Sequence, residues 1–292
     1  MKNVLLAFVL LIVGSNFAKA QDLLDLLGEE EPTTVYAKNA FKSSRVINGQ
    51  SMEMIAKGTL DFRILHRFGE LSGGAYEFFG LDAASMRLGF DYGITKNWTV
   101  GVGRSTSRKE LDGFVKYRIM HQSTGEKNHP FSLLYVGGIT GDGMKWENPD
   151  IKNYFSSRLA FYNQLIIGRK FNDRLTLQLS PTFLHRNLVD LASEPNDLYS
   201  LGVGGRIKIT QRLALTGDYF YVFNSTDSTA VNPLSIGVDI ETGGHVFQLH
   251  FSNAVGMNER AFLADTKGDW LKGEIRFGFN LSRIFQIVKP KE

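Results

Sequence analysis

Hydrophobic and polar residues alternate one by one through most of the chain. In residues 59–68, Leu60, Phe62 and Ile64 share one face of an extended segment, and charged or hydroxyl side chains occupy much of the other. In residues 85–94 every second residue is apolar and the residues between them are small or charged. This period of two predicts β-strands with one face against an apolar phase and the other against a polar one.

The same test along the chain predicts about twelve strands. Most reach the roughly 9 to 11 residues that a tilted strand needs to cross a membrane, although residues 235–241 are short. We therefore predict an all-β fold, an antiparallel up-and-down transmembrane β-barrel over residues 51–292. The predicted strands are residues 59–68, 85–94, 98–106, 111–122, 131–141, 155–170, 174–186, 198–210, 212–223, 235–241, 245–253 and 271–281.

The connections between these strands alternate between short and long. Outer-membrane barrels join their strands by short turns on the periplasmic side and by longer loops outside, and roughly nine of the eleven predicted connections follow that rule. The exceptions are residues 107–110, which are short for an outer loop, and residues 123–129, which are long for an inner turn. An even strand number would return both ends of the barrel to the periplasmic side.

The N-terminus has the features of a secretory signal. Lys2 precedes an apolar run over residues 4–14, and Ala18-Lys19-Ala20 is a cleavage motif, so we predict a signal peptide over residues 1–20. An uncleaved anchor is the alternative, but the apolar run is short for spanning. Residues 21–50 are predicted to be a polar periplasmic leader that is flexible, tucks into the barrel or meets a periplasmic partner.

Composition narrows the class of protein. The 30 Gly and 22 Phe against 7 Pro favour aromatic strands joined by glycine-containing turns, and the absence of Cys excludes disulfides. The formal charge is +3, and removing Lys2 and Lys19 with the signal peptide leaves +1. Because basic residues are interleaved with acidic ones, no nucleic-acid partner is expected.

Charged residues recur on the polar faces of the strands and are predicted to line the lumen. As a channel, such a lumen would be slightly electropositive and would favour anions. As a closed interior, the same side chains would pair across strands and conduct nothing. The pattern leaves both interpretations open. The predicted lumen-lining residues are Asp61, Arg63, Arg87, Asp91, Lys116, Arg118, Arg158, Arg206, Lys208, Asp218, Glu274 and Arg276.

Catalytic motifs give little support to an enzyme. The chain has neither a G-x-S-x-G elbow nor an H-E-x-x-H metal motif. His66 with Ser105 or Ser107 could form a hydrolytic pair at the outer rim, but no third group that would orient the pair is apparent. The glycine-rich residues 101–105 lack the Lys of a phosphate loop, so glycine there is expected to keep the inner face of a strand small. No cofactor or metal is expected.

Several segments resemble a known family. Residues 45–51 (RVINGQS) and 58–69 (GTLDFRILHRFG) are similar to the opening of an uncharacterised β-barrel family of Bacteroidota, a domain of unknown function. Residues 78–84 with 87–93, and 103–105 with 112–118, strengthen the resemblance. The resemblance is specific over residues 45–120 and architectural beyond them. It implies an outer-membrane barrel and a Bacteroidota-like source, and it supplies no functional residues.

These observations predict an outer-membrane channel or porin-like protein for small solutes, with anions favoured. The alternatives are a closed structural or partner-docking barrel without conductance and a membrane-embedded hydrolase. The expected partners are the lipid bilayer, the outer-membrane assembly machinery and a periplasmic protein that meets residues 21–50.

Overall fold

A computed structural model describes residues 33–189, 191–227 and 229–288 of the chain. The predicted signal peptide and residues 21–32 of the predicted leader lie outside these ranges. Among the described residues, no helix has both the length and the apolar character needed to cross a membrane.

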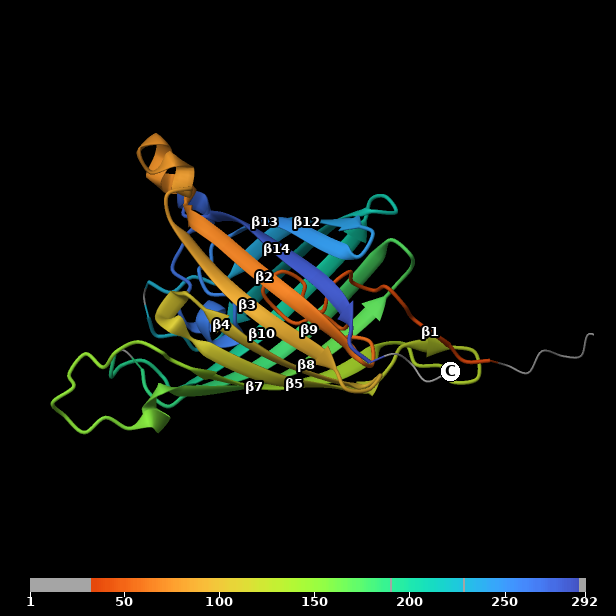
Figure 1. Cartoon of the computed structure of the whole chain (residues 1–292), viewed down its shortest axis with the longest axis horizontal. Coiled ribbons are helices and arrows are strands. Elements are labelled where there is room, and N and C mark those ends of the chain that lie inside the picture. Colours follow the sequence, from red (N-terminus) through yellow and green to blue (C-terminus); the bar gives the residue numbers. More distant parts are fainter. Residues whose placement is uncertain (1–32, 190, 228, 289–292) are drawn as a thin grey trace, which may run out of the picture. The chain divides into compact units, whose positions relative to one another are not determined.

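Twelve antiparallel strands form a closed barrel in which each strand pairs with its neighbour along the chain and the last pairs with the first (Figure 1). The barrel strands are β2 (Thr59–Glu70), β3 (Ala84–Gly93), β4 (Trp98–Ser105), β5 (Leu111–Met120), β7 (Ser132–Gly141), β8 (Leu159–Lys170), β9 (Leu175–Arg186), β10 (Asp197–Lys208), β11 (Leu213–Val222), β12 (Leu234–Thr242), β13 (His245–Ser252) and β14 (Arg276–Gln286). The predicted fold class is confirmed.

Short helices occupy several of the connections. They are η1 (Leu71–Gly80), η2 (Ser107–Lys109), η3 (Phe155–Arg158), α2 (Glu259–Ala264) and η4 (Trp270–Lys272). A separate small unit contains β1 (Val35–Tyr36) and β6 (Ser123–Thr124), which pair as a two-stranded antiparallel sheet.

The barrel closes where β14 pairs with β2. Ile64 lies opposite Leu281 and Asp61 opposite Ile284, with a register shift at the outer end between Arg276 and Gly278. Closure pairs the backbone of every barrel strand on both sides, which a sheet in lipid requires because no water is present to satisfy a free edge.

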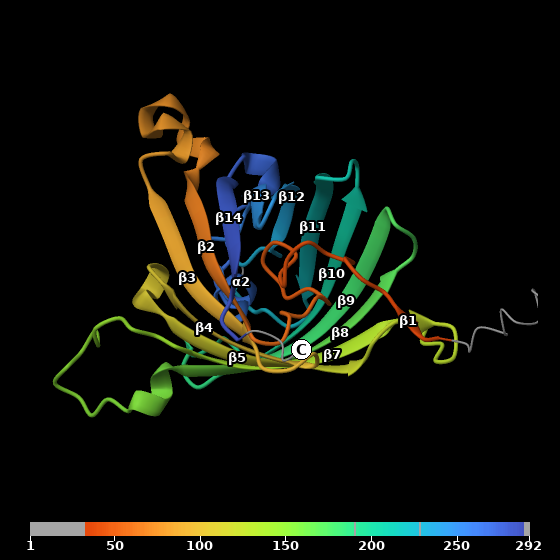
Figure 2. The same ribbon diagram turned by 45° about the vertical axis from the view of Figure 1, so that its right-hand side comes forward.

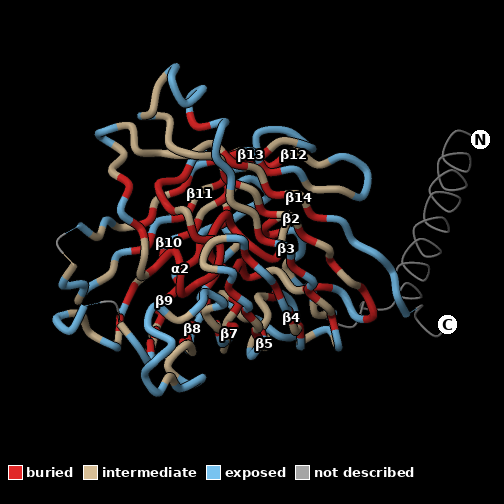
Figure 3. Tube along the Cα trace, turned by 60° about the vertical axis from the view of Figure 1, so that its left-hand side comes forward, coloured by how far each residue is buried: buried red, intermediate tan, exposed pale blue. Residues whose placement is uncertain are grey.

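Side chains alternate between the two faces of the wall as the period of two predicts. On β3, Arg87 and Asp91 are completely buried on the inner face, whereas Leu88 and Phe90 on the outer face are 36% and 46% exposed. The buried residues therefore gather inside the barrel (Figure 3). The outer face carries an apolar belt suited to lipid.

Two predicted strands begin too early in the sequence. Residues 155–158 form η3, so β8 starts at Leu159, and β14 starts at Arg276 rather than at residue 271. Leu271 lies in η4, where the side chain of Asp269 accepts a hydrogen bond from its backbone N–H. Gly273 has a φ of 73°, so the chain turns before the last strand.

Of the states predicted for the leader, tucking into the barrel is the one that its last eleven residues adopt, and flexibility is wrong for them. Residues 40–55, here called the N-terminal insert, lie inside the barrel (Figure 2). Their hydrogen-bond partners are inward-facing side chains on β2, β5, β9, β11, β13 and β14. Only a segment inside the barrel can reach strands on so many sides of the wall.

A second segment also enters the barrel. Residues 253–265, here called the loop insert, belong to the β13–β14 connection, which the sequence pattern predicts to be an outer loop. They contain α2, and Met257 and Phe262 within them are completely buried. The lumen therefore holds two segments of the chain itself.

Candidate functional site: the occupied lumen

The N-terminal insert turns back on itself at residues 46–49. Arg45 and Gln50 form an antiparallel bridge, and the backbone N–H of Val46 donates to the Gly49 carbonyl at 2.9 Å. The Asn48-Gly49 dipeptide at the tip is typical of tight turns. Any side chain at position 49 would collide with the ring of Phe220, so glycine also allows the tip to approach the wall.

Asp218 on β11 holds this tip. Its Oδ2 atom accepts hydrogen bonds from the backbone N–H groups of Ile47 at 3.1 Å, Asn48 at 2.7 Å and Gly49 at 3.0 Å. Consecutive N–H groups converging on one carboxylate oxygen form a compact anion-binding arrangement. The buried carboxylate of Asp218 thus accepts hydrogen bonds from three buried backbone N–H groups.

Neutral wall side chains pair with more of the insert backbone. Gln178 accepts from the N–H of Met52 at 3.0 Å and donates to the carbonyl of Gln50 at 2.7 Å. Gln248 donates to the carbonyl of Val46. These side chains replace the strand partner that an inserted segment lacks, so the insert is bound through its backbone.

Three buried wall cations also depend on the inserts. Lys116 donates to the carbonyls of Ser44 at 3.2 Å and Glu53 at 2.6 Å, and Arg206 donates to the carbonyl of Ala40 at 3.4 Å. Arg67 donates to the loop-insert carbonyls of residues 254 and 256 at 2.8 and 2.7 Å and to the side chain of Asn48 in the N-terminal insert. Within the described ranges, no carboxylate lies within 4.0 Å of these three side chains.

Other wall charges pair with each other. Arg63 lies 3.6 Å from Asp61 and 3.7 Å from Asp91, and Arg87 holds Asp112 with two hydrogen bonds, one of 2.8 Å from Nε. The Arg63–Asp91 pair joins the neighbouring strands β2 and β3, and the Arg87–Asp112 pair reaches from β3 past β4 to β5.

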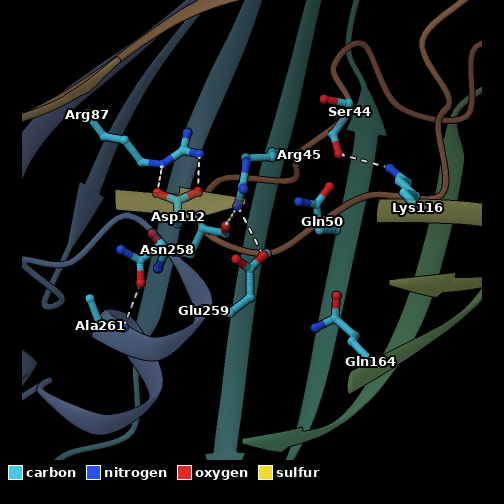
Figure 4. Close-up of polar contacts among 12 residues, drawn as sticks. Ser44, Arg45, Gln50, Arg87, Asp112, Lys116, Gln164, Asn258, Glu259 and Ala261 are labelled. Atoms are coloured by element: carbon cyan, nitrogen blue, oxygen red, sulfur yellow. Dashed lines mark hydrogen bonds and ion pairs between the residues drawn. The ribbon is translucent and has the colours of Figure 1, made fainter. Parts of the chain in front are cut away.

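An ion pair joins the two inserts (Figure 4). Arg45 in the N-terminal insert lies 3.1 Å from Glu259 in the loop insert, and both side chains are almost completely buried. The α2 helix around Glu259 is capped by the side chain of Asn258, which accepts from the N–H of Ala261 at 2.9 Å. A charge pair sealed from water couples the positions of the two segments.

The loop insert is held to the wall at Glu110, which precedes β5. Glu110 accepts from Asn258 at 2.6 Å and from Arg260 at 2.9 Å. Burial raises the pKa of the Glu110 carboxyl, and the Arg260 guanidinium offsets part of that rise. On another side, the ring of Phe262 packs 4.9 Å from the ring of Phe220.

The predicted lumen-lining residues fall into three groups. Most lie buried on the inner face: Asp61, Arg63, Arg87, Asp91, Lys116, Arg206 and Asp218. Arg118, Lys208 and Arg276 share the inward parity but lie half-buried near strand ends, where Arg118 contacts His121, Lys208 contacts Gln211 and Arg276 pairs with Glu70.

The remaining two predicted residues are misplaced by the sequence pattern. Arg158 lies in η3, where its guanidinium stacks 3.8 Å from the ring centre of Trp146. Glu274 precedes β14 and accepts from the backbone N–H of Asp269 at 2.9 Å. Both belong to connections, because β8 and β14 begin later than predicted.

The sequence pattern missed residues 40–55 as part of the site. The signal that could have revealed them is the Asn48-Gly49 turn, which follows the apolar pair Val46-Ile47 inside a segment taken to be a polar leader.

The predicted hydrolytic pair is not assembled. His66 points outward, where its ring stacks 4.8 Å from the ring of Phe279, whereas Ser105 is buried on the inner face. Ser107 lies in η2 beyond the end of β4. At Gly103 an added side chain would collide with the guanidinium of Arg87, so glycine makes room for an inward arginine.

Comparison with known proteins agrees with a membrane barrel. A family described as a membrane-bound β-barrel domain matches residues 41–285, a range that includes nearly all of the N-terminal insert. The match agrees with the resemblance seen in residues 45–120, and the Bacteroidota-like source stays a prediction. A search of curated proteins finds no match.

Three solved structures match this chain at low sequence identity and with TM-scores below 0.5. The porin NanC is 9% identical with a TM-score of 0.48, over 77% of this chain and 98% of that one. OmpT of Vibrio cholerae is 10% identical with a TM-score of 0.38, over 80% and 99%. The translocator domain of the autotransporter NalP from Neisseria meningitidis is 12% identical with a TM-score of 0.34, over 80% and 89%.

Proposed function

This chain belongs to the DUF5777 family of membrane-bound β-barrel domains, and from that premise we propose that it is an outer-membrane channel for small anionic solutes. At rest, the N-terminal insert closes this channel. An outer-membrane location is supported by the even number of antiparallel strands, the apolar outer belt and the predicted signal peptide.

The closed resting state is supported by the contacts of the N-terminal insert. Wall side chains satisfy its backbone at Ile47, Asn48, Gly49 and Met52. A buried donor or acceptor left without a partner costs about 1 to 3 kcal/mol, so several such contacts together favour the closed state over a dry, vacated lumen. Water entering an emptied lumen would offset that cost, which makes the closure reversible.

The anion preference rests on one observation: among the described residues, the hydrogen-bond acceptors that the inserts supply to Lys116, Arg206 and Arg67 are carbonyl and amide oxygens. When the N-terminal insert leaves, Lys116 and Arg206 lose these acceptors, and Arg67 loses Asn48 but keeps the loop-insert carbonyls of residues 254 and 256. Lys116 and Arg206 would then face the solvent of the lumen as positive sites, and rings of Lys and Arg lower the barrier for anions.

The proposal is tested by conductance of the full chain in planar bilayers. The double variant Gln178→Ala/Gln248→Ala removes three backbone contacts of the N-terminal insert without changing the charge of the lumen. We expect little conductance from the wild-type protein and much more from this variant. In a salt gradient, the reversal potential of the variant should show anion preference.

Lys116→Gln, added to the double variant, should reduce that anion preference. The matched control is Arg212→Gln, which removes one positive charge at an exposed position between β10 and β11. The reversal potential does not depend on how many barrels are open, so the comparison is independent of gating. Steady wild-type conductance would contradict closure at rest, and cation preference in the double variant would contradict the anion assignment.

A second candidate function is a closed barrel that docks a partner and conducts nothing. The buried pair of Arg45 and Glu259 favours it, because it fastens the two inserts together inside the lumen. Silence of the wild-type protein and of the Gln178→Ala/Gln248→Ala variant would support this candidate. A periplasmic partner would then have to meet residues before the N-terminal insert.

A further inference from the structure

The connection between β2 and β3 presents an unusual aromatic surface. Tyr76 is 95% exposed, Phe78 60% and Phe79 55%, and Glu77 is the only charged residue between positions 71 and 81. Exposed apolar clusters of this kind mark contact surfaces on proteins. The lumen and its inserts do not use these residues.

Backbone hydrogen bonds close the base of this connection. The backbone N–H of Gly69 donates to the Ala83 carbonyl at 2.9 Å, and the N–H of Leu71 donates to the Ile275 carbonyl at 2.9 Å. Gly80 has a φ of 85°, and a side chain there would overlap the carbonyl of Gly69. Tyr76, Phe78 and Phe79 therefore lie in a loop whose two ends are joined by close backbone contacts.

The backbone under the aromatic pair is strained. Phe78 and Phe79 have φ values of 47° and 54°, in the left-handed region that bulky residues avoid. Left-handed backbone at bulky residues is unfavourable, and strain of this kind is characteristic of binding and functional sites. Two adjacent phenylalanines held this way indicate that their presentation has a use.

The lipid-facing belt of the barrel continues to the base of this connection. Phe68, the last outward residue of β2, stacks 5.9 Å from Phe277, which packs 5.6 Å from Phe251. From Leu60 to Phe68 a strand tilted by about 40° rises roughly 21 Å, close to the apolar band of about 25 Å. Residues 71–81 thus begin at the level of the lipid headgroups.

A second exposed connection provides a contrast. The β7–β8 connection also exposes large apolar residues, with Phe155 at 75%, but charged residues are interspersed along it. Two of its rings are covered by cations, Tyr154 by Lys152 at 4.9 Å and Trp146 by Arg158 at 3.8 Å. The charged residues of the β7–β8 connection suit it to an aqueous environment, whereas residues 71–81 carry only one charged side chain, Glu77.

We infer that residues 71–81 bind the membrane surface, with Tyr76, Phe78 and Phe79 lying at the boundary between headgroups and acyl chains. Aromatic rings prefer that boundary, and η1 (orange in Figures 1 and 2) is carried on the ends of the tilted β2 and β3. The loop is an interfacial anchor beside the barrel, and this role is independent of whether the lumen conducts.

The absence of Cys from the chain allows a single-label test in lipid vesicles. Tyr76→Cys carries a polarity-sensitive fluorophore and leaves both phenylalanines in place, and Phe155→Cys is the matched exposed control. We expect the label at position 76 to shift to the blue and to be quenched severalfold more by headgroup-linked nitroxide lipids than the label at position 155. Phe78→Ser/Phe79→Ser, added to Tyr76→Cys, should abolish most of that difference.

Two results would overturn the inference. A label at position 76 that aqueous iodide quenches as readily as the label at position 155 would mean that the loop stands in water. A label shielded from both iodide and nitroxide lipids would mean that protein covers the loop.

Discussion

The carboxylate of Asp218 fixes the position of the N-terminal insert at the level of single atoms. One oxygen accepts hydrogen bonds from the three consecutive backbone N–H groups of residues 47–49. The alternation of residues predicts that Asp218 faces the lumen. The alternation cannot predict that Asp218 binds residues 47–49, because every residue except proline carries a backbone N–H group.

Asp218→Ala should release the tip of the N-terminal insert. The substitution leaves three buried N–H groups without an acceptor, at about 1 to 3 kcal/mol each. We expect faster proteolysis within residues 40–55 of the folded barrel in detergent. Asp218→Asn keeps one acceptor oxygen and should be cleaved at a rate closer to wild type, and equal rates for Asp218→Ala and wild type would exclude this anchoring role.

Glu110 should make stability depend on pH. Its pKa is raised by burial, so the folded state binds its proton more tightly than the unfolded state does. The contribution of this group to the free energy of unfolding is therefore fully present below its ordinary pKa of 4.5 and declines as pH rises through the raised value.

Glu110→Gln removes this titration. The denaturation midpoint should therefore fall less steeply in the variant than in wild type as pH rises from about 4 to 7, the range that begins near an ordinary Glu pKa. Glu147→Gln, at an exposed position of the β7–β8 connection, is the control. A Glu110→Gln profile that runs parallel to wild type would contradict this origin of the pH dependence.

At the scale of elements, strands are predicted well wherever lipid lies on one side and polar groups on the other. Alternation fails at residues 271–275, which continue the period of two although η4 and Gly273 turn the chain before β14. A turn stabilised by its own cap can carry the same apolar pattern as a strand, so the pattern alone cannot locate the strand start.

The two inserts should be energetically coupled through Arg45 and Glu259. Replacing one partner of a buried ion pair leaves an unpaired charge and costs about 3 to 5 kcal/mol. We expect Arg45→Met and Glu259→Gln each to lower the free energy of unfolding strongly, and the double variant to lose much less than the sum.

A second double-mutant cycle serves as the control. Arg108 and Asp142 lie 2.7 Å apart, but the Arg108 side chain is 39% exposed. Exposed pairs contribute about 0 to 1 kcal/mol, so Arg108→Met and Asp142→Asn should show weak coupling. Equal coupling energies in the two cycles would show that the buried pair has no special role in joining the inserts.

At the scale of the whole molecule, the sequence predicts the wall of the barrel but not its contents. The N-terminal insert contains Ser44, Asn48, Gln50 and Ser51, and its polarity suggested a segment in water. The lumen is lined with charged and amide side chains, so it accepts the same composition as solvent does. Polarity therefore separates lipid from non-lipid surroundings and cannot separate a filled lumen from the periplasm.

A reversible crosslink between the N-terminal insert and the wall tests most directly whether residues 40–55 close the barrel. A Cβ atom at Gly168 would lie 3.1 Å from that of Met52, which is closer than the roughly 3.5 to 4.5 Å that disulfides span, so the N-terminal insert must shift by a few tenths of an ångström for the bond to form. The natural chain has no Cys. Met52→Cys/Gly168→Cys is placed in the Gln178→Ala/Gln248→Ala background and its bilayer conductance is recorded before and after reduction. We predict closed barrels while the disulfide is intact and open barrels once it is reduced, and the same high conductance in both states would contradict closure by the insert.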